Sequence, residues 1–290
     1  MSSRGRTAFF LLVLAISVTF FHLPNACADD APLDISGEGL IPVGNTTIAL
    51  ISEKVSIQVM VEPTGGAMRQ DNPDTATIAA ELLFRNRSRQ EVQLKLGFPI
   101  GNEEMLADLI EERQSGRKDD CSITANGRQV AFTKYLSRNE KDPDMARKWW
   151  VWTQSFPPEK TLEIIHTYKG YFGGGHIEPE DYNVRYFRYI LTTGSLWKGR
   201  IGRAEIEMTF DRPLKPEWFL AFPKPAFQSP KRIRWIFRDF EPTEDIVFAY
   251  SWAINKKRLK EYCAELRAST AQRKLETLES FQRISPFPGR

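Results

Sequence analysis

Imidazole and carboxylate side chains gather in one short stretch of the sequence, directly after three consecutive glycines. Groups of these two types are the usual protein ligands of zinc and calcium, and a metal-dependent hydrolase would use them. The candidate ligands are His166, His176, Glu178 and Asp181. No two-histidine or Glu-x-x-His spacing fixes their geometry, so the competing interpretation is a glycine turn followed by solvated acids, with His166 on a sheet face. We favour the second interpretation and predict no cofactor.

Aromatic side chains offer a different kind of site, a surface that stacks against a sugar or grips a peptide. The candidates are Trp149, Trp150, Trp152, Tyr171 and Trp197. On a strand, Trp150 and Trp152 share one face and Trp149 lies on the other, so at least one face is buried in a layered fold. Core packing is therefore the favoured alternative to an exposed platform.

Signatures of other catalytic classes do not occur in the sequence. There is no G-x-S-x-G elbow, and the glycines before His176 lack the Lys and Ser or Thr of a phosphate-binding loop. Outside the N-terminal apolar segment, only His166 and His176 can act as imidazole bases. The sequence therefore favours a binding role over catalysis.

The elements that position these residues are predicted from strict alternation of apolar and polar residues. It runs through Val55–Val61, recurs in Ile78–Phe84 and again in Val92–Phe98. The polar turn at Asn86–Arg89 predicts that the last two segments pair as an antiparallel hairpin. Asn126-Gly127 supplies the positive-φ residues of a second hairpin.

Further strands follow at short intervals, each rich in β-branched or aromatic residues. They are predicted at Trp149–Phe156, Leu162–Tyr168, Tyr186–Thr193, Ala204–Phe210, Ile233–Phe237 and Ile246–Trp252. Because so many strands occur without helices between them, we predict an all-β protein, an antiparallel β-sandwich with Ig-like layering. Apolar residues spaced by three and four in Lys256–Ile284 predict an amphipathic C-terminal helix that docks on the body or on a partner.

These signals divide the chain into four segments. We predict a signal peptide at 1–28, a main β-sandwich at 29–200, a second β unit or a continuation of the sandwich at 201–255, and a helical tail at 256–290. The third segment is separated because the Pro-rich stretch Pro213–Pro230 interrupts the run of strands.

The N-terminus carries the features of a secretory signal. Arg4 and Arg6 precede the apolar run Ala8–Phe21, and Ala26 and Ala28 supply an A-x-A cleavage site. Cleavage removes two arginines and no acidic residue, so the formal charge falls from +3 to +1, which argues against nucleic-acid binding. We expect a periplasmic or secreted protein with no stable membrane span after cleavage.

Two cysteines, Cys121 and Cys263, remain after cleavage. An oxidising compartment permits one disulfide between them. The alternative is two separate buried thiols that behave as small apolar side chains.

Four short stretches form a recognisable set when they are read together. They are Gly37-Glu38-Gly39-Leu40 running into Ile51-Ser52-Glu53-Lys54-Val55, Phe84-Arg85-Asn86 followed by Gly97-Phe98-Pro99, Trp152 to Phe156, and Tyr189-Ile190-Leu191-Thr192-Thr193-Gly194 with Trp197-Lys198-Gly199. The set resembles the exported bacterial proteins grouped as domain of unknown function forty-four twenty-four, and the last stretch is its most specific part. The resemblance implies a Gram-negative-type envelope location and a β-rich fold, and it carries no catalytic residue over to this chain.

These observations lead to one main hypothesis and two alternatives. The main hypothesis is an exported, non-catalytic β-sandwich that binds a protein, peptide or glycan in the bacterial envelope. One alternative is the metal-dependent hydrolase that uses His166 and His176. The other is an envelope assembly factor that docks a partner through its C-terminal helix.

Overall fold

The computed structural model describes residues 40–42, 47–61, 74–105, 121–139, 142, 144–177, 182–252, 254–268, 270–283 and 285–286. The chain divides into two units, 1–31 and 32–290, and all described residues belong to the second. The predicted signal peptide at 1–28 lies outside the described residues.

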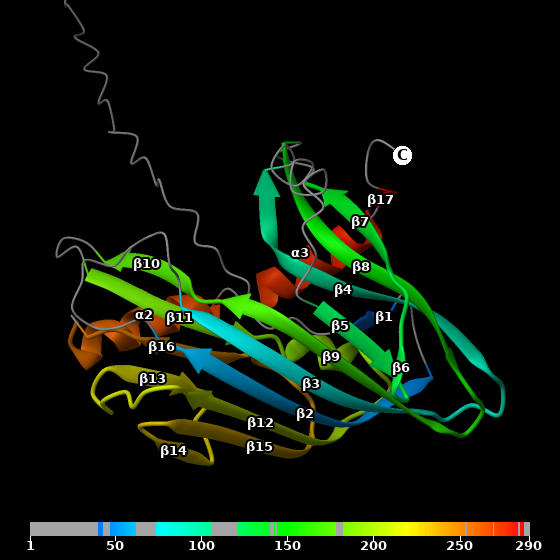
Figure 1. Ribbon diagram of the computed structural model, residues 1–290, viewed down its shortest axis with the longest axis horizontal. Coiled ribbons are helices and arrows are strands. Elements are labelled where there is room, and N and C mark those ends of the chain that lie inside the picture. The colour runs from blue at the N-terminus through cyan, green and yellow to red at the C-terminus, as the bar shows by residue number, and fades with distance from the viewer. Residues whose placement is uncertain are drawn as a thin grey trace, which may run out of the picture. The chain divides into compact units, whose positions relative to one another are not determined.

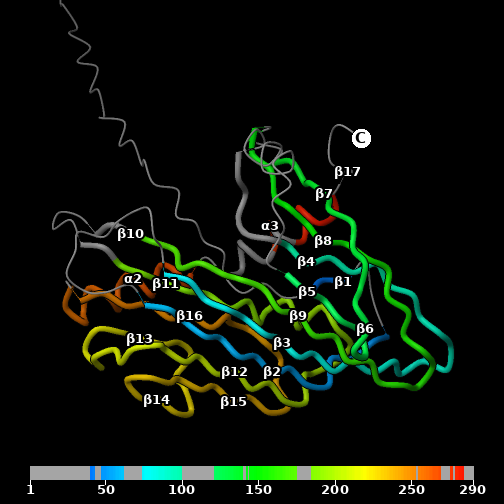
Figure 2. Tube along the Cα trace, in the orientation of Figure 1, coloured from blue at the N-terminus to red at the C-terminus, as the bar shows by residue number. Residues whose placement is uncertain are grey.

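The largest sheet has eight strands in the order β14-β15-β12-β2-β3-β9-β5-β6 (Figure 1). Its strands are β2 (Ile48–Met60), β3 (Thr75–Asn86), β5 (Cys121–Ala125), β6 (Arg128–Gln129), β9 (Thr161–Tyr171), β12 (Ile201–Phe210), β14 (Phe227–Ser229) and β15 (Arg232–Phe240). β12 pairs with β2 in parallel, whereas the other neighbours pair antiparallel. The trace in Figure 2 shows β2 in blue beside β12 in olive, so strands from before and after residue 200 share this sheet.

Two smaller sheets complete the strand layers. The five-stranded sheet has the order β1-β4-β8-β7-β17 and the four-stranded sheet the order β10-β11-β16-β13. The first contains β1 (Ile41–Pro42), β4 (Val92–Met105), β7 (Thr133–Arg138), β8 (Met145–Phe156) and β17 (Ser285–Pro286). The second contains β10 (Gly173–Ile177), β11 (Tyr182–Tyr189), β13 (Phe219–Phe222) and β16 (Ile246–Tyr250).

The main hydrophobic core joins the eight-stranded sheet to both smaller sheets. Ile57 and Ile78 of the large sheet belong to one buried cluster with Trp150 of β8 and Phe248 of β16. The alternation in Val55–Val61 appears as a buried–exposed pattern along β2, as period-two patterning requires. The protein is therefore all-β with sandwich-like layering of antiparallel and mixed sheets, which confirms the predicted fold class.

Helices α2 (Lys256–Ala268) and α3 (Thr270–Gln282) lie on the smaller sheets. Leu259 and Cys263 of α2 pack on the four-stranded sheet, and Phe281 of α3 packs on Trp149 of the five-stranded sheet. The Asn255 side chain begins α2, because its Oδ1 accepts hydrogen bonds from two backbone amides of the first turn. These buried residues of the tail thus cover the protein's own sheets, whereas Leu275 of α3 is 51% exposed. Within the described residues, no helix has the length and apolarity needed to cross a membrane.

The predicted hairpins have different outcomes. Asn126 and Gly127, at φ values of 47° and 75°, join β5 to β6 as an antiparallel pair, which confirms that hairpin. The hairpin predicted between Ile78–Phe84 and Val92–Phe98 is wrong, because β3 pairs with β2 and β9 while β4 pairs with β1 and β8. Asn86 holds the connection between the two sheets, donating from Nδ2 to the carbonyls of Gln90 and Phe156. Alternation specifies which face is buried, not which strand is the partner.

Candidate functional site

The residues predicted as metal ligands do not assemble into a site in the described part of the chain. His166 lies on β9 of the eight-stranded sheet, and His176 lies on β10 of the four-stranded sheet opposite Asn183. Glu178 and Asp181 lie outside the described residues. Among the residues that are described, no group of three His, Cys, Asp or Glu side chains could hold a metal ion.

The tryptophan side chains considered as an exposed stacking platform are buried in this structure. Trp149, Trp150, Trp152 and Trp197 are at most 5% exposed. Both faces of β8 are covered, since Trp149 packs under α3 while Trp150 and Trp152 belong to the main core. Tyr171 is half-buried, with the Lys169 ammonium 5.7 Å from its ring centroid. These indoles therefore stabilise the core and are not available to stack against a ligand.

The possible disulfide does not form in this structure. Cys121 is on β5 of the eight-stranded sheet, whereas Cys263 is buried between α2 and the four-stranded sheet. Burial raises the pKa of the Cys263 thiol to about 12, so this side chain remains protonated and apolar in character.

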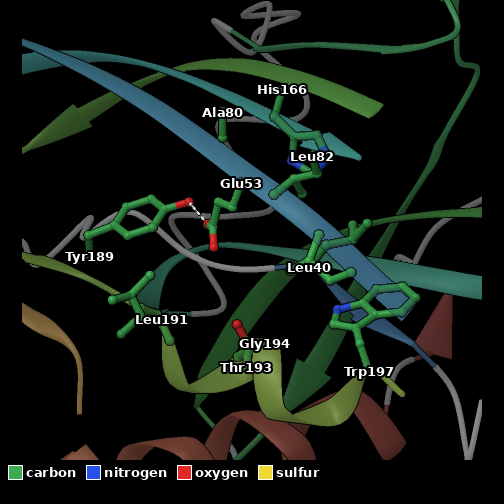
Figure 3. Close-up of a pocket in the computed structure, with 12 residues that line it drawn as sticks. Leu40, Glu53, Ala80, Leu82, His166, Tyr189, Leu191, Thr193, Gly194 and Trp197 are labelled. Carbon is green, nitrogen blue, oxygen red and sulfur yellow. Dashed lines mark hydrogen bonds between the residues drawn. The ribbon is translucent and has the colours of Figure 1, made fainter. Parts of the chain in front are cut away.

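The first candidate site is a buried polar pocket that joins Glu53 of β2, His166 of β9 and Tyr189 of β11 (Figure 3). Tyr189 Oη donates a hydrogen bond of 2.7 Å to Glu53 Oε1, and both side chains are buried. Glu53 has the same strand parity as Val55, which places its carboxyl on the inward face of β2. The alternation in the sequence of β2 already places Glu53 on the inward face. A buried carboxylate is rare, so the sequence alone does not lead to this prediction.

Burial controls the ionisation of this pocket. Loss of hydration raises the pKa of Glu53 to about 7, and the hydrogen bond from Tyr189 opposes this rise. Burial also lowers the pKa of His166 from its ordinary 6.5 to about 3, so its imidazole is neutral at physiological pH. His166 Nε2 is a buried atom without a hydrogen-bond partner among the described residues, and its ring meets Phe98 edge-on at 5.0 Å.

A short 3₁₀ helix, η1 (Thr192–Leu196), closes one side of this pocket. Asp245 Oδ1 accepts hydrogen bonds from the backbone amides of Leu191 and Thr192 and from Thr192 Oγ1. The strand predicted at Tyr186–Thr193 is therefore too long, since β11 ends at Tyr189 and the chain then turns into η1. A Cβ atom at Gly194 would meet Ile201 Cδ1 at 2.7 Å, so a larger residue at this position requires the Ile201 side chain to shift.

The pocket is small. Its volume is about 10 Å³, which is room for about one water molecule. Trp197 forms part of the wall and packs against Phe84 with a ring separation of 4.4 Å. The pocket can hold a proton on Glu53, but an organic substrate does not fit beside the three polar side chains.

The second candidate site is an open groove with a volume of about 270 Å³, here called the β13–β14 groove. It is lined by the whole of β13 (Phe219–Phe222), by Lys224 and Pro225, by Gln228 of β14 and by Lys256 of α2. Lys224, Gln228 and Lys256 are exposed, and none of the acidic residues that the structure describes lines the groove. The sequence alone does not reveal this site, because all of its lining residues except Lys256 lie in the Pro-rich stretch Pro213–Pro230.

The nearby surface adds further apolar and cationic groups. Phe227 of β14 is 44% exposed, and the Arg232 guanidinium lies over its ring at 4.8 Å from the centroid. Arg267 lies over Phe222 in the same manner at 4.7 Å. A groove with an apolar floor and a few polar groups at its rim has the general composition of a ligand site.

No family model and no curated protein matches this chain. Among solved structures, it resembles one from Legionella pneumophila described as a candidate nutrient-binding protein. The TM-score is 0.51 at 18% sequence identity, over 76% of this chain and 72% of that chain. An M1 zinc metallopeptidase from Deinococcus radiodurans gives a TM-score of 0.34 at 11% identity, over 71% of this chain and 43% of that one. The first likeness shows a shared fold, and the second carries no argument.

Proposed function

We propose that this protein is a non-catalytic β-sandwich binding protein that takes its ligand in the β13–β14 groove. The observation that carries the proposal is the groove itself, which combines a volume of about 270 Å³, the apolar residues of β13 and two exposed lysines. Open concave sites of this composition bind ligands by apolar contact and use their few polar groups for orientation. The proposal includes a location in the bacterial envelope. It also includes the resemblance to domain of unknown function forty-four twenty-four that the sequence suggests.

The contrast with the buried pocket supports binding over catalysis. Glu53 and His166 are the acid and base candidates of this pocket, and both are buried around a volume of about 10 Å³. A general acid or base has to come within hydrogen-bond reach of a substrate, which this enclosure prevents. The metal-dependent hydrolase alternative therefore gains no support from His166.

The structural neighbour supports the same role. The Legionella protein that shares the fold is described as a candidate nutrient-binding protein. The helical-docking alternative receives less support, because Leu259, Cys263 and Phe281 of the tail already pack on the sheets.

Calorimetric titration with decanoate tests the proposal, because this probe joins an apolar chain to one carboxylate. We expect saturable binding to the wild-type protein and loss of binding in Gln228→Trp, whose indole fills the groove from an exposed strand position. Gln93→Trp is the matched control, since Gln93 is exposed on β4 of the five-stranded sheet. The absence of wild-type binding, or equal binding by Gln228→Trp, would contradict the proposed function.

A further inference from the structure

The apolar surface that a ligand can reach in the β13–β14 groove comes from one face of β13 and from a nearby proline. Phe219 and Ala221 of β13 are buried in the main core, whereas Leu220 and Phe222 are half-buried on the opposite face. Pro225 is half-buried too and lines the same groove. Because residues two apart share a strand face, Leu220 and Phe222 are neighbours there and form, with Pro225, an apolar strip.

The size of the groove favours a slender ligand. Its volume of about 270 Å³ lies just below the range of about 300–1,000 Å³ that is typical of sites for drug-sized molecules. The lining comes from β13, from the segment 224–228 and from the first residue of α2. A single alkyl chain can lie along the apolar strip, whereas a lipid with two chains would exceed this volume.

The charge at the groove is positive. Lys224 and Lys256 are exposed, and neither forms an ion pair with any residue that the structure describes. The Lys256 ammonium donates a hydrogen bond of 3.2 Å to the Pro216 carbonyl, which holds one cation at the groove. Glu217 follows Pro216 in the chain, but it does not line the groove. An unpaired ammonium beside an apolar surface attracts an anionic head group.

The arginine beside the groove is already engaged. Arg267 pairs with Glu244 at 2.8 Å and lies over the Phe222 ring at 4.7 Å from the centroid. Its planar guanidinium is the type of group that grips an anion through two parallel hydrogen bonds. The lysines act instead as point charges, and a single carboxylate satisfies them without a fixed bidentate geometry.

We propose that the β13–β14 groove binds the free anion of a single-chain fatty acid. The alkyl chain lies on the apolar strip of Leu220, Phe222 and Pro225, and the carboxylate lies near Lys224 and Lys256. This inference rests on the proposed function and specifies its ligand class. Burial of the chain supplies affinity, and the two lysines select the anion against neutral and cationic amphiphiles of the same length.

Calorimetric titration with decanoate, decanol and decyltrimethylammonium, each below the concentration at which it forms micelles, tests the choice of head group. The probes share an apolar chain and differ in charge. We expect decanoate to bind about tenfold more tightly than decanol, because it adds two charge pairs at an exposed site. We expect no measurable binding of decyltrimethylammonium, which the lysines repel, or of acetate, which lacks the chain.

A charge-reversed variant sharpens the test. Lys224→Glu combined with Lys256→Glu keeps the apolar strip and reverses the charge beside it, so this variant should bind decyltrimethylammonium and lose decanoate. Binding of the cationic probe also shows that the variant is folded. If the double variant does not fold, Lys224→Glu alone should weaken decanoate binding about fivefold. Lys160→Glu, at an exposed position in the β8–β9 turn, is the matched control and leaves all affinities unchanged.

The outcomes separate this inference from the proposed function. Equal affinities for decanoate and decanol, or a folded double variant that still prefers decanoate, would overturn the inference. The proposed function would stand in that case if Gln228→Trp still abolishes binding. Failure of the wild-type protein to bind decanoate would overturn both proposals. Association with phosphatidylcholine vesicles that decanoate does not displace would assign the apolar strip to a membrane and would also overturn the inference.

Discussion

The buried pocket and the β13–β14 groove differ in what they contain and in what can reach them. The pocket holds Glu53, His166 and Tyr189 around about 10 Å³, whereas the groove offers about 270 Å³ with lysines as its charged groups. Side chains suited to proton transfer are thus enclosed in the core, and the accessible site lacks them. The difference fits the proposal that the groove binds the ligand, whereas the buried polar pocket affects the stability of the fold.

This division predicts opposite responses to substitution. Changes around the pocket alter the free energy of unfolding and its pH dependence, whereas changes at the rim of the groove alter ligand affinity and leave stability nearly unchanged.

The largest expected effect is the loss of a pocket wall. Trp197→Ala removes a buried indole that packs on Phe84 and lowers the free energy of unfolding by about 3–5 kcal/mol. Phe227→Ala, beside the groove and 44% exposed, lowers it by less than about 1 kcal/mol. Urea unfolding of both variants measures the difference. Similar losses of unfolding free energy in the two variants would contradict the distinction between a pocket that supports the fold and a groove that does not.

His166 makes the folded protein sensitive to acid. Because burial lowers its pKa to about 3, the unfolded chain binds a proton below pH 6.5 that the folded protein does not bind. The stabilisation is therefore complete above pH 6.5 and is lost as the pH falls toward 3. From pH 7 to pH 4, the wild type should lose about 3 kcal/mol more than His166→Leu. If the unfolding free energies of the two proteins changed equally between pH 7 and pH 4, His166 would not be the source of the acid sensitivity.

Glu53 has the opposite dependence on pH. Burial raises its pKa to about 7, so its contribution to stability is complete below about pH 4.5 and is lost as the pH rises through 7. From pH 5 to pH 8, Glu53→Gln should gain about 2–3 kcal/mol relative to the wild type, since the amide cannot ionise and still accepts from Tyr189. Unfolding in urea at these two pH values measures the gain. If the difference in unfolding free energy between the two proteins were the same at both pH values, the titrating group would not be Glu53.

The smallest stability effect is expected at the groove. Lys224 is exposed and forms no ion pair with any residue that the structure describes, so Lys224→Glu changes the free energy of unfolding by less than about 0.5 kcal/mol while it weakens decanoate binding. Thermal unfolding and calorimetric titration with decanoate measure the two quantities. A large loss of stability would show that this lysine supports the fold.

The sequence predicted the buried face of a strand and the layered fold better than it predicted the pairing of strands and the location of the candidate sites. Alternation along β2 identified its inward face, and the same parity places Glu53 inside, although a buried carboxyl was not expected. Pairing of β3 with β4 was wrong, because a short polar turn can join strands of one sheet or carry the chain to the next. The groove could not be predicted, since it depends on two sheet edges, β13 and β14, whose approach is set by packing of the whole core.

The central claim is that ligand binds in the groove and not in the buried pocket. Amide NMR spectra of the wild-type protein during titration with decanoate test it most directly, because each backbone amide reports its own surroundings. We predict shifts concentrated at Phe219–Phe222, Lys224 and Gln228, with the amides of Tyr189–Gly194 unchanged. Shifts centred on Tyr189–Gly194, or no shifts at high decanoate concentration, would contradict the account.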